Sequence, residues 1–207
     1  MQIRTFSDNP LGENTYLVYV EGRDDAVIID PGCKTEILTE ALKAAGKKLG
    51  AILLTHGHFD HAAYADELRR ATGARIYIHN NDAGMLKYKA LNASELGDGS
   101  YPDYSFEADS YYVVLETGDL ITCGLEFVVV YTPGHTPGSV TLYLPDEKTA
   151  FTGDTLFNGG FGRTDLPGGS MLQLRRSLKK LFRLPRETAI YPGHGTSATM
   201  DEILGKI

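Results

Sequence analysis

Four short apolar segments of this chain end in the same way, and this repetition constrains the fold more than any other feature. Each segment runs into a glycine-containing turn that carries histidine or aspartate. With their turns, the segments are 51–61, 127–135, 150–154 and 189–194. Short apolar runs bounded by glycine and proline are typical of buried strands. Because binding groups commonly lie at strand ends, we expect these polar side chains to meet at one edge of a sheet.

The turn after the first segment holds four candidate binding groups within six positions: His56, His58, Asp60 and His61. In an extended segment, residues two apart point to the same side, so His56 and His58 face one space. Gly57 leaves room for a close approach there. Asp60 and His61 open the following helix and turn back toward the same space. This spacing differs from the i, i+4 histidine pair of a zincin, and it therefore predicts another kind of metal cage.

Together the strand ends offer seven metal ligands. Imidazole and carboxylate groups suit zinc, iron or manganese. Seven ligands exceed the coordination of one tetrahedral ion, so we expect two divalent ions that share a carboxylate. We favour zinc, with iron or manganese as the alternatives. The remaining histidine, His79, has no such neighbours, and we interpret it as structural. The seven candidates are His56, His58, Asp60, His61, His135, Asp154 and His194.

The composition favours an ordinary soluble globular protein. We expect one domain from the 207 residues, of which 42% are hydrophobic. A net charge of -7, with 27 acidic and 20 basic residues, argues against nucleic acid and anionic lipid as partners. No apolar run approaches the ~20 residues of a membrane helix, and residues 1–6 lack the pattern of a secretory signal. Cys33 and Cys123 are not marked as a pair, so we expect a cytoplasmic protein. The oligomeric state is left open.

Apolar runs alternate with amphipathic helical patterns along the chain. Further strands are expected at 14–20, 25–30, 75–79 and 139–144, and helices at 37–45, 64–71, 174–182 and 201–206. This mixture indicates the α/β or the α+β class. The acidic, tyrosine-rich stretch 87–110 breaks the rhythm. We interpret it as a long excursion over the surface and not as a linker between domains.

The order and spacing of the seven candidates resemble the metallo-β-lactamase superfamily over most of the chain. The resemblance implies a four-layer αββα sandwich of the α+β class, with two mixed sheets face to face, helices on the outer faces and metals at one edge. The early motif Asp30-Pro31-Gly32 resembles that superfamily's support for the metal loop. The resemblance assigns His56, His58 and His135 to one metal, and Asp60, His61 and His194 to the other, with Asp154 bridging.

The loops 132–139 and 153–165 are similar to those of glyoxalase II, the hydroxyacylglutathione hydrolases, and most of all to their short bacterial branch. The resemblance implies hydrolysis of a small-molecule thioester. Larger glyoxalase II enzymes add a C-terminal helical domain that grips glutathione. Because about a dozen residues follow His194, we expect no such domain within residues 1–207. β-Lactamases of this fold lack the bridging aspartate, so Asp154 disfavours that activity.

The chemistry expected of such a site is attack by metal-bound hydroxide on a carbonyl carbon. A dinuclear site lowers the pKa of bound water, and one metal polarises the carbonyl oxygen. Asp60, as ligand and hydrogen-bond acceptor, would orient the hydroxide, and we predict it to be the catalytic residue. A thiolate with a pKa of about 8.5 leaves with little help from an acid. Arg163 is a candidate for a substrate carboxylate, although we favour pairing with Asp165, which would order the loop.

Three alternatives remain open. The first is hydrolysis of lactones or other esters on the same fold. The second is a mononuclear iron enzyme that resembles the persulfide dioxygenases, with iron held by His56, His135 and Asp154. The cysteine often found before the glycine-arginine run of those enzymes is replaced here by Phe161. The third is a noncatalytic metal-binding module, which has least support because a structural site needs no open coordination position.

Overall fold

Each of the two β-sheets is formed by one continuous half of the chain. The computed structural model describes residues 1–96, 99–101, 112–115 and 117–206. The first sheet has the strand order β1-β2-β3-β4-β5-β6, and the second has the order β12-β11-β10-β9-β8-β7. Both sheets are mixed, because each combines parallel and antiparallel pairs.

The strands of the first sheet are β1 (Gln2–Phe6), β2 (Thr15–Tyr19), β3 (Asp25–Ile29), β4 (Lys48–Leu53), β5 (Arg75–Ile78) and β6 (Tyr112–Val114). The strands of the second are β7 (Gly118–Thr122), β8 (Leu125–Tyr131), β9 (Val140–Leu144), β10 (Thr149–Gly153), β11 (Ala189–Pro192) and β12 (Ala198–Thr199). The helices are α1 (Thr35–Ala45), α2 (Phe59–Ala62), α3 (Ala65–Thr72), α4 (Lys89–Asn92), α5 (Met171–Leu181) and α6 (Met200–Leu204). Two 3₁₀ segments are η1 (Asn80–Leu86) and η2 (Ser94–Leu96).

The first sheet is buried on both faces, and the alternation along its strands shows how. Successive side chains of a strand point to opposite faces. Leu17 and Ile28 lie in one apolar cluster with Leu38 and Leu68 of α1 and α3. Their neighbours along the strands, Val18 among them, belong to a second cluster that includes residues of the other sheet. Continuous apolar runs are expected of strands covered on both faces.

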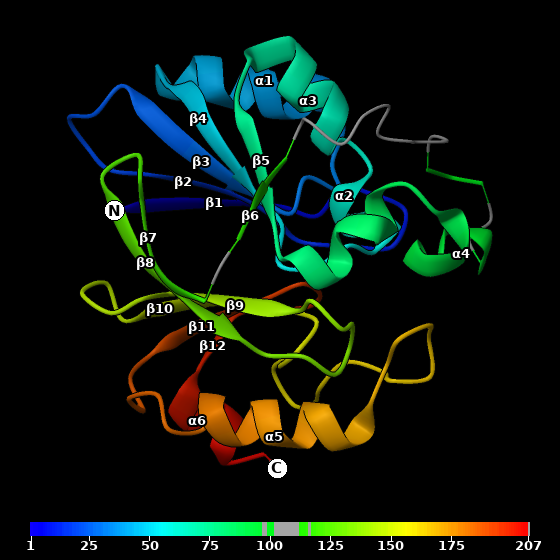
Figure 1. Cartoon of the computed structure of the whole chain (residues 1–207). Coiled ribbons are helices and arrows are strands. Elements are labelled where there is room, and N and C mark those ends of the chain that lie inside the picture. Colours follow the sequence, from blue (N-terminus) through cyan, green and yellow to red (C-terminus); the bar gives the residue numbers. More distant parts are fainter. Residues whose placement is uncertain (97–98, 102–111, 116, 207) are drawn as a thin grey trace.

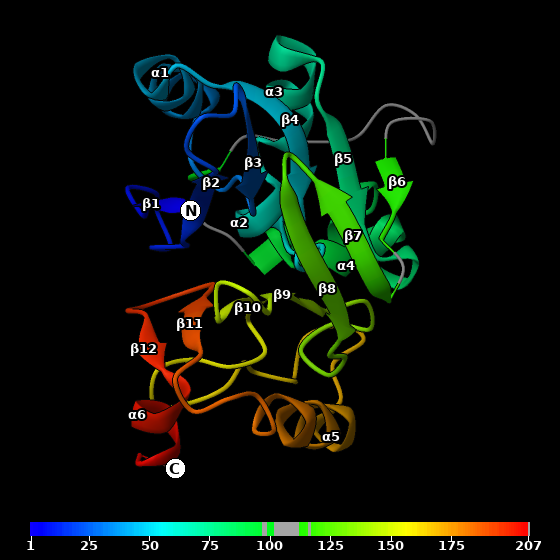
Figure 2. The same ribbon diagram turned by 90° about the vertical axis from the view of Figure 1, so that its left-hand side faces the viewer.

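The second sheet is covered in the same manner on its outer face. Ala150 and Ile190 pack with Leu174 and Leu178 of α5, together with side chains of α6. Figure 1 shows the resulting layers: α1 and α3 lie outside the first sheet, and α5 and α6 lie outside the second. The perpendicular view in Figure 2 shows the two sheets facing each other between these helices. The expected αββα sandwich of the α+β class is therefore confirmed.

The strands that the sequence did not predict as such are β1, β6, β7 and β12, which are the outermost strands of the two sheets. Edge strands need less apolar surface: β7 alternates between half-buried and exposed positions, and three of the five residues of β1 are exposed. In the predicted excursion 87–110, the described residues form α4 and η2, and residues 97–98 and 102–110 lie outside the described part. None of the described helices combines the length and hydropathy needed to cross a membrane.

Candidate metal centre

The structure brings all seven predicted ligands together at the end of the sandwich where α2 lies. The loop after β4 and the first turn of α2 supply four of them, and the loops after β8, β10 and β11 supply one each. Five of the seven are buried, while the side chains of Asp154 and His194 are 12% and 29% exposed. The two halves of the chain thus contribute to one site, which lies between the strand ends of two sheets and not at the edge of a single sheet.

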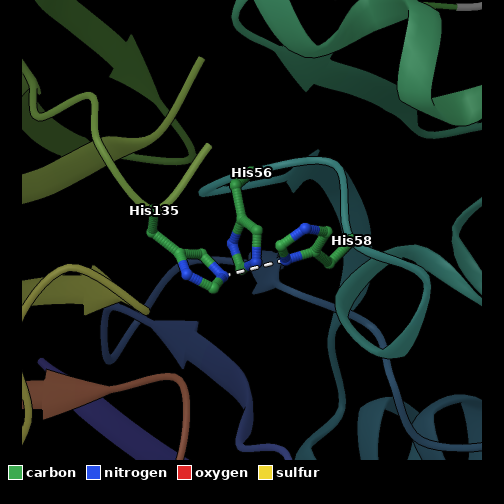
Figure 3. Close-up of side chains that lie close together, drawn as sticks. All are labelled: His56, His58 and His135. Carbon is green, nitrogen blue, oxygen red and sulfur yellow. Dashed lines mark hydrogen bonds between the residues drawn. The ribbon is translucent and has the colours of Figure 1, made fainter. Parts of the chain in front are cut away.

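The first group of candidate ligands consists of His56, His58 and His135, whose ring nitrogens lie within 4.8 Å of one another. Figure 3 shows the three rings converging from two separate loops. Nδ1 of His58 lies 2.8 Å from Nε2 of His135. Among the described residues, the buried Nε2 atoms of His56 and His58 have no hydrogen-bond partner. Unpartnered buried nitrogens that face a common space fit a metal ion.

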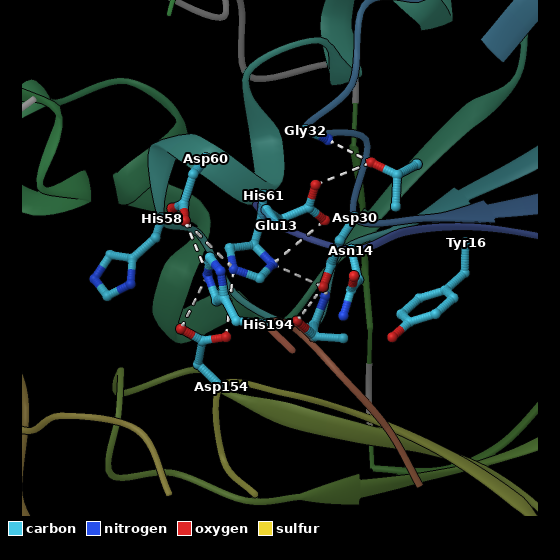
Figure 4. A network of polar contacts seen from close by, with 12 residues as sticks. Glu13, Asn14, Tyr16, Asp30, Gly32, His58, Asp60, His61, Asp154 and His194 are labelled. Atoms are coloured by element: carbon cyan, nitrogen blue, oxygen red, sulfur yellow. Dashed lines mark hydrogen bonds and ion pairs between the residues drawn. The ribbon is translucent and has the colours of Figure 1, made fainter. Parts of the chain in front are cut away.

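The second group consists of Asp60, His61 and His194. Oδ2 of Asp60 lies 3.2 Å from Nε2 of His194 and 3.7 Å from Nε2 of His61. Figure 4 shows these three side chains pointing toward one another, with Asp154 on the side of the second sheet. A carboxylate with two imidazoles is a donor set that suits a divalent transition metal.

Asp154 stands between the two groups. Its Oδ1 lies 3.4 Å from Nε2 of His61, and its Oδ2 lies 3.4 Å from Nε2 of His135 and 3.7 Å from Nε2 of His194. A side chain at Gly193 would place Cβ 2.2 Å from Oδ1 of Asp154, so this approach of two strand ends requires glycine. The geometry fits two ions that share the Asp154 carboxylate.

Burial and charge shift the histidine pKa values in opposite directions in the two groups of candidate ligands. Desolvation is the largest of the effects that lower the pKa of His56, and it lowers the pKa of His58 to about 3. Desolvation also opposes charge on His61, but Asp60 and Asp154 outweigh it and raise the pKa of His61. The excess of carboxylate charge around His61 favours a cation at this position.

Asp30 supports the loop that carries the first histidines, as the resemblance implied. Its carboxylate accepts hydrogen bonds from the backbone N–H of Thr55 at 2.7 Å and from the Thr55 hydroxyl at 2.6 Å. Its Oδ2 also lies 3.0 Å from Nδ1 of His61. Asp30 has a positive φ of 50°, which is uncommon outside glycine and tolerated by aspartate and asparagine. Glu13, which is fully buried, faces the same nitrogen of His61, with its Oε1 3.9 Å from Nδ1.

The sequence analysis missed Asp82 of η1. Its buried carboxylate accepts hydrogen bonds from the backbone N–H of Gly57 at 3.0 Å, the Thr136 hydroxyl at 2.6 Å and the backbone N–H of Gly138 at 2.6 Å. These bonds tie the loop of His56 and His58 to the loop of His135. The predicted close approach at Gly57 is also present, since a Cβ there would lie 3.0 Å from the Asp82 carbonyl oxygen. The position of Asp82 shortly after the strand β5 was the one feature of the sequence that could have pointed to it.

Two more supports were also missed. Asn14, which precedes β2, donates hydrogen bonds to the carbonyl oxygens of Pro192 and Gly195, on either side of His194. The Arg163 carbonyl oxygen lies 2.8 Å from Nδ1 of His135. Such partners fix the orientation of a ligand, and they are backbone contacts that a sequence does not display.

A cavity of about 690 Å³ opens over both groups of ligands. Arg163 lines it, but its guanidinium makes two hydrogen bonds of 2.7 and 2.6 Å to Asp165, which is the pairing that the sequence analysis favoured. Tyr101 also lines the cavity and packs edge-on against Phe59 with ring centroids 5.2 Å apart. Part of the excursion 87–110 therefore flanks the candidate metal centre. His79, outside the site, stacks on Tyr131 with ring centroids 4.6 Å apart.

Two facing mixed sheets with paired His/Asp clusters at their edge define a class of metal-binding sandwich proteins. The chain belongs to the metallo-beta-lactamase superfamily, whose family model matches residues 8–194.

Three relatives match over nearly the whole chain. Hydroxyacylglutathione hydrolase GloC of Haemophilus influenzae is 33% identical over 208 residues, which cover 98% of this chain and 94% of GloC. The crystal structure of the BLEG-1 B3 metallo-beta-lactamase is similar with a TM-score of 0.91 and 34% identity, over 99% of this chain and 97% of BLEG-1. That of TTHA1623 in a di-iron-bound form has a TM-score of 0.86 and 36% identity, over 98% of both chains.

Proposed function

We propose that this protein is a metal-dependent hydrolase that cleaves thioesters at a dinuclear centre. The observation that carries the proposal is the position of Asp154, whose two oxygens each lie 3.4 Å from a histidine of a different group. The di-iron form of TTHA1623 and the hydrolase GloC support the same reading. Two bound divalent ions would lower the pKa of a water molecule and polarise the substrate carbonyl.

Asp60 is positioned to direct the attacking water. Its side chain lines the cavity, and its Oδ2 is held by Nε2 of His194 at 3.2 Å. Burial raises the pKa of Asp60, but His61 and His194 outweigh it, so the net effect is a lowered pKa and an ionised carboxylate. An ionised Asp60 accepts a hydrogen bond from the water and aims its lone pair at the carbonyl carbon. The water oxygen bonds to that carbon, and the C–S bond breaks with its electron pair on sulfur, so that a carboxylate and a thiolate leave. Of the two water protons, one is taken up by the thiolate in solvent and the other passes to the solvent.

The surroundings of the centre favour a thiol as the leaving group. Outside the seven ligand candidates, the described lining holds two ionisable side chains, Tyr101 and Arg163. The Tyr101 hydroxyl donates a hydrogen bond to Oδ1 of Asn9 at 2.9 Å, and burial raises the pKa of Tyr101. Arg163 is paired with Asp165. Neither is suited to protonate a leaving alkoxide, whereas a thiolate with a pKa of about 8.5 leaves unprotonated.

The rival proposals use the same residues differently. A mononuclear iron dioxygenase would use His56, His135 and Asp154 as ligands. It would leave four ligand candidates unused: His58, Asp60, His61 and His194. Ester and lactone hydrolysis would share the centre but would require a poorer leaving group. The BLEG-1 relative adds a β-lactam as a substrate to be tested.

The test is a panel of substrates with protein reloaded with zinc, iron or manganese at zero, one and two equivalents. The panel holds a thioester, the oxoester with the same acyl group, a lactone, a β-lactam, and a persulfide with oxygen uptake recorded. We expect thioester hydrolysis to rise up to two equivalents and the oxoester to react at least about 100-fold more slowly. Oxygen uptake with a single iron, or hydrolysis of the lactone or β-lactam alone, would assign one of the rival functions.

A further inference from the structure

The cavity above the candidate metal centre has an apolar wall that the hydrolytic chemistry does not use. The wall is formed by Leu11, Phe59, Leu96, Tyr101, Phe157 and Leu166. Leu11 and Leu96 are 52% and 72% exposed, which places large apolar side chains in water at the mouth of the cavity. These residues come from four separate segments, so their convergence is produced by the fold. Exposed apolar surface beside a polar centre marks a ligand-binding site.

The charged residues that line the cavity also favour an uncharged ligand. Among the described residues that line the cavity, Arg163 is the one strongly basic side chain. Its guanidinium is engaged by both oxygens of Asp165, so the pair carries no net charge. The carboxylates of Asp60 and Asp154 lie at the floor. A substrate with free carboxylates would meet no matching group along this wall.

We propose that the apolar wall binds an uncharged alkyl or aryl group of the substrate, so that the protein selects thioesters with an apolar tail over charged peptide thioesters. This proposal rests on the thioester hydrolysis proposed above. Leu11 and Leu96 are the specificity-determining residues, because they are the wall residues that lose the most water contact when a tail is bound. A volume of about 690 Å³ is enough for a ligand of moderate size.

The kinetic test uses two series of thioesters with metal-loaded protein. One series varies the acyl group from acetyl to octanoyl on the neutral thiol N-acetylcysteamine, and the other varies the thiol of an acetyl thioester. We expect kcat/KM to rise about threefold to fourfold per methylene in the series whose tail reaches the wall. Comparing the two series shows whether the tail belongs to the acyl or to the thiol half. The acetyl ester of glutathione serves as the charged member.

The variants Leu96→Ser and Leu11→Ser reduce the wall without touching the ligands. Each should lower the octanoyl-to-acetyl ratio of kcat/KM about threefold to tenfold. Leu172→Ser is the matched control, because Leu172 is 63% exposed on α5 and does not line the cavity. Equal ratios in the parent protein and in both wall variants would overturn the proposal.

A binding measurement separates this proposal from the proposed function. Thioethers that replace the carbonyl by a methylene cannot be hydrolysed, and calorimetry reports their affinity and the heat-capacity change of apolar burial. Tail-dependent binding that Leu96→Ser weakens, without turnover of any thioester, would support the wall and reject the hydrolase. Turnover of all thioesters at one rate, or a preference above tenfold for the glutathione ester, would reject the wall and retain the hydrolase.

Discussion

The 3.0 Å contact between Oδ2 of Asp30 and Nδ1 of His61 decides which ring nitrogen of His61 is left for a metal. Because Nδ1 is engaged by the Asp30 carboxylate, Nε2 is the nitrogen that a bound metal would use. That Nε2 is buried, has no hydrogen-bond partner among the described residues, and faces Oδ1 of Asp154 at 3.4 Å. Carboxylates that orient metal-binding histidines in this way raise the basicity of the ligand.

We therefore expect Asp30→Asn to lower the affinity of the His61 site for metal about 10-fold to 100-fold. Asparagine tolerates the positive φ of Asp30, so the variant tests the charge and not the backbone. Metal titration monitored by calorimetry measures the effect, and Asp24→Asn, at an exposed position, is the control. An unchanged affinity at both sites would show that Asp30 is only a structural support of the loop.

The position of Asp154 predicts two metal ions per chain when metal is plentiful. Replacing Asp154 by alanine removes the oxygens that face both groups of ligands, so both affinity and activity should fall. Elemental analysis of the parent and of Asp154→Ala after equilibration with metal and gel filtration measures the stoichiometry. One tightly held ion in the parent, with no second site on titration, would contradict the dinuclear centre.

Asp60→Asn should reduce turnover more than it reduces binding of the first metal. Asp60 belongs to the group with His61 and His194 and is not a member of the group formed by the other three histidines. Loss of an oriented hydrogen-bond acceptor for the attacking water is expected to lower kcat about 100-fold, with a smaller change in KM. Steady-state kinetics and the metal content of the same preparation are compared. If the variant loses metal equally at both sites, Asp60 has been assigned to the wrong role.

Asp82→Asn should destabilise the protein because all three hydrogen bonds at this side chain require an acceptor. The amide nitrogen of asparagine turns one donor toward another donor, which costs about 1–3 kcal/mol for a buried group. Denaturant unfolding of the metal-free protein measures this, with the exposed Asp119→Asn as a control.

A cobalt-substituted form tests whether Asp82 also positions the first metal site. We expect the visible absorption bands of cobalt to shift in Asp82→Asn, because the loops of His58 and His135 lose their common anchor. If Asp82→Asn has normal stability and an unchanged cobalt spectrum, Asp82 neither stabilises the two loops nor positions the first metal site.

The sequence indicated which side chains cluster at the candidate metal centre, but it did not indicate most of the groups that hold them in place. His56, His135 and His194 all follow apolar strands through glycine turns, and this combination is visible in a one-dimensional chain. Asp82 has no such pattern, because its hydrogen-bond partners come from segments distant in sequence. Asp82 contacts Thr136 across 54 positions. Hydrogen bonds of this kind depend on how the loops are placed after folding, which periodicity does not describe.

The same limit applies to the fold. The apolar runs of β2, β3 and β4 are buried on both faces, so their sequences do not show which face meets a helix and which meets the other sheet. The sandwich was therefore expected from the family resemblance and not from periodicity. The edge strand β1 was not predicted because its residues Gln2–Phe6 are largely exposed and lack an apolar face.

The division of each sheet into one continuous half of the chain has a consequence for the order of folding. Every strand pairs with its neighbours in sequence, so neither half needs a strand of the other half to complete its sheet. Four ligand candidates lie in the half that leaves the ribosome first, and His135, Asp154 and His194 follow in the second. A shared pair of ions can be bound only after the halves have docked. Metal binding would then stabilise the docked halves in the last step of folding. Until that step, a newly made chain would remain accessible to chaperones and proteases.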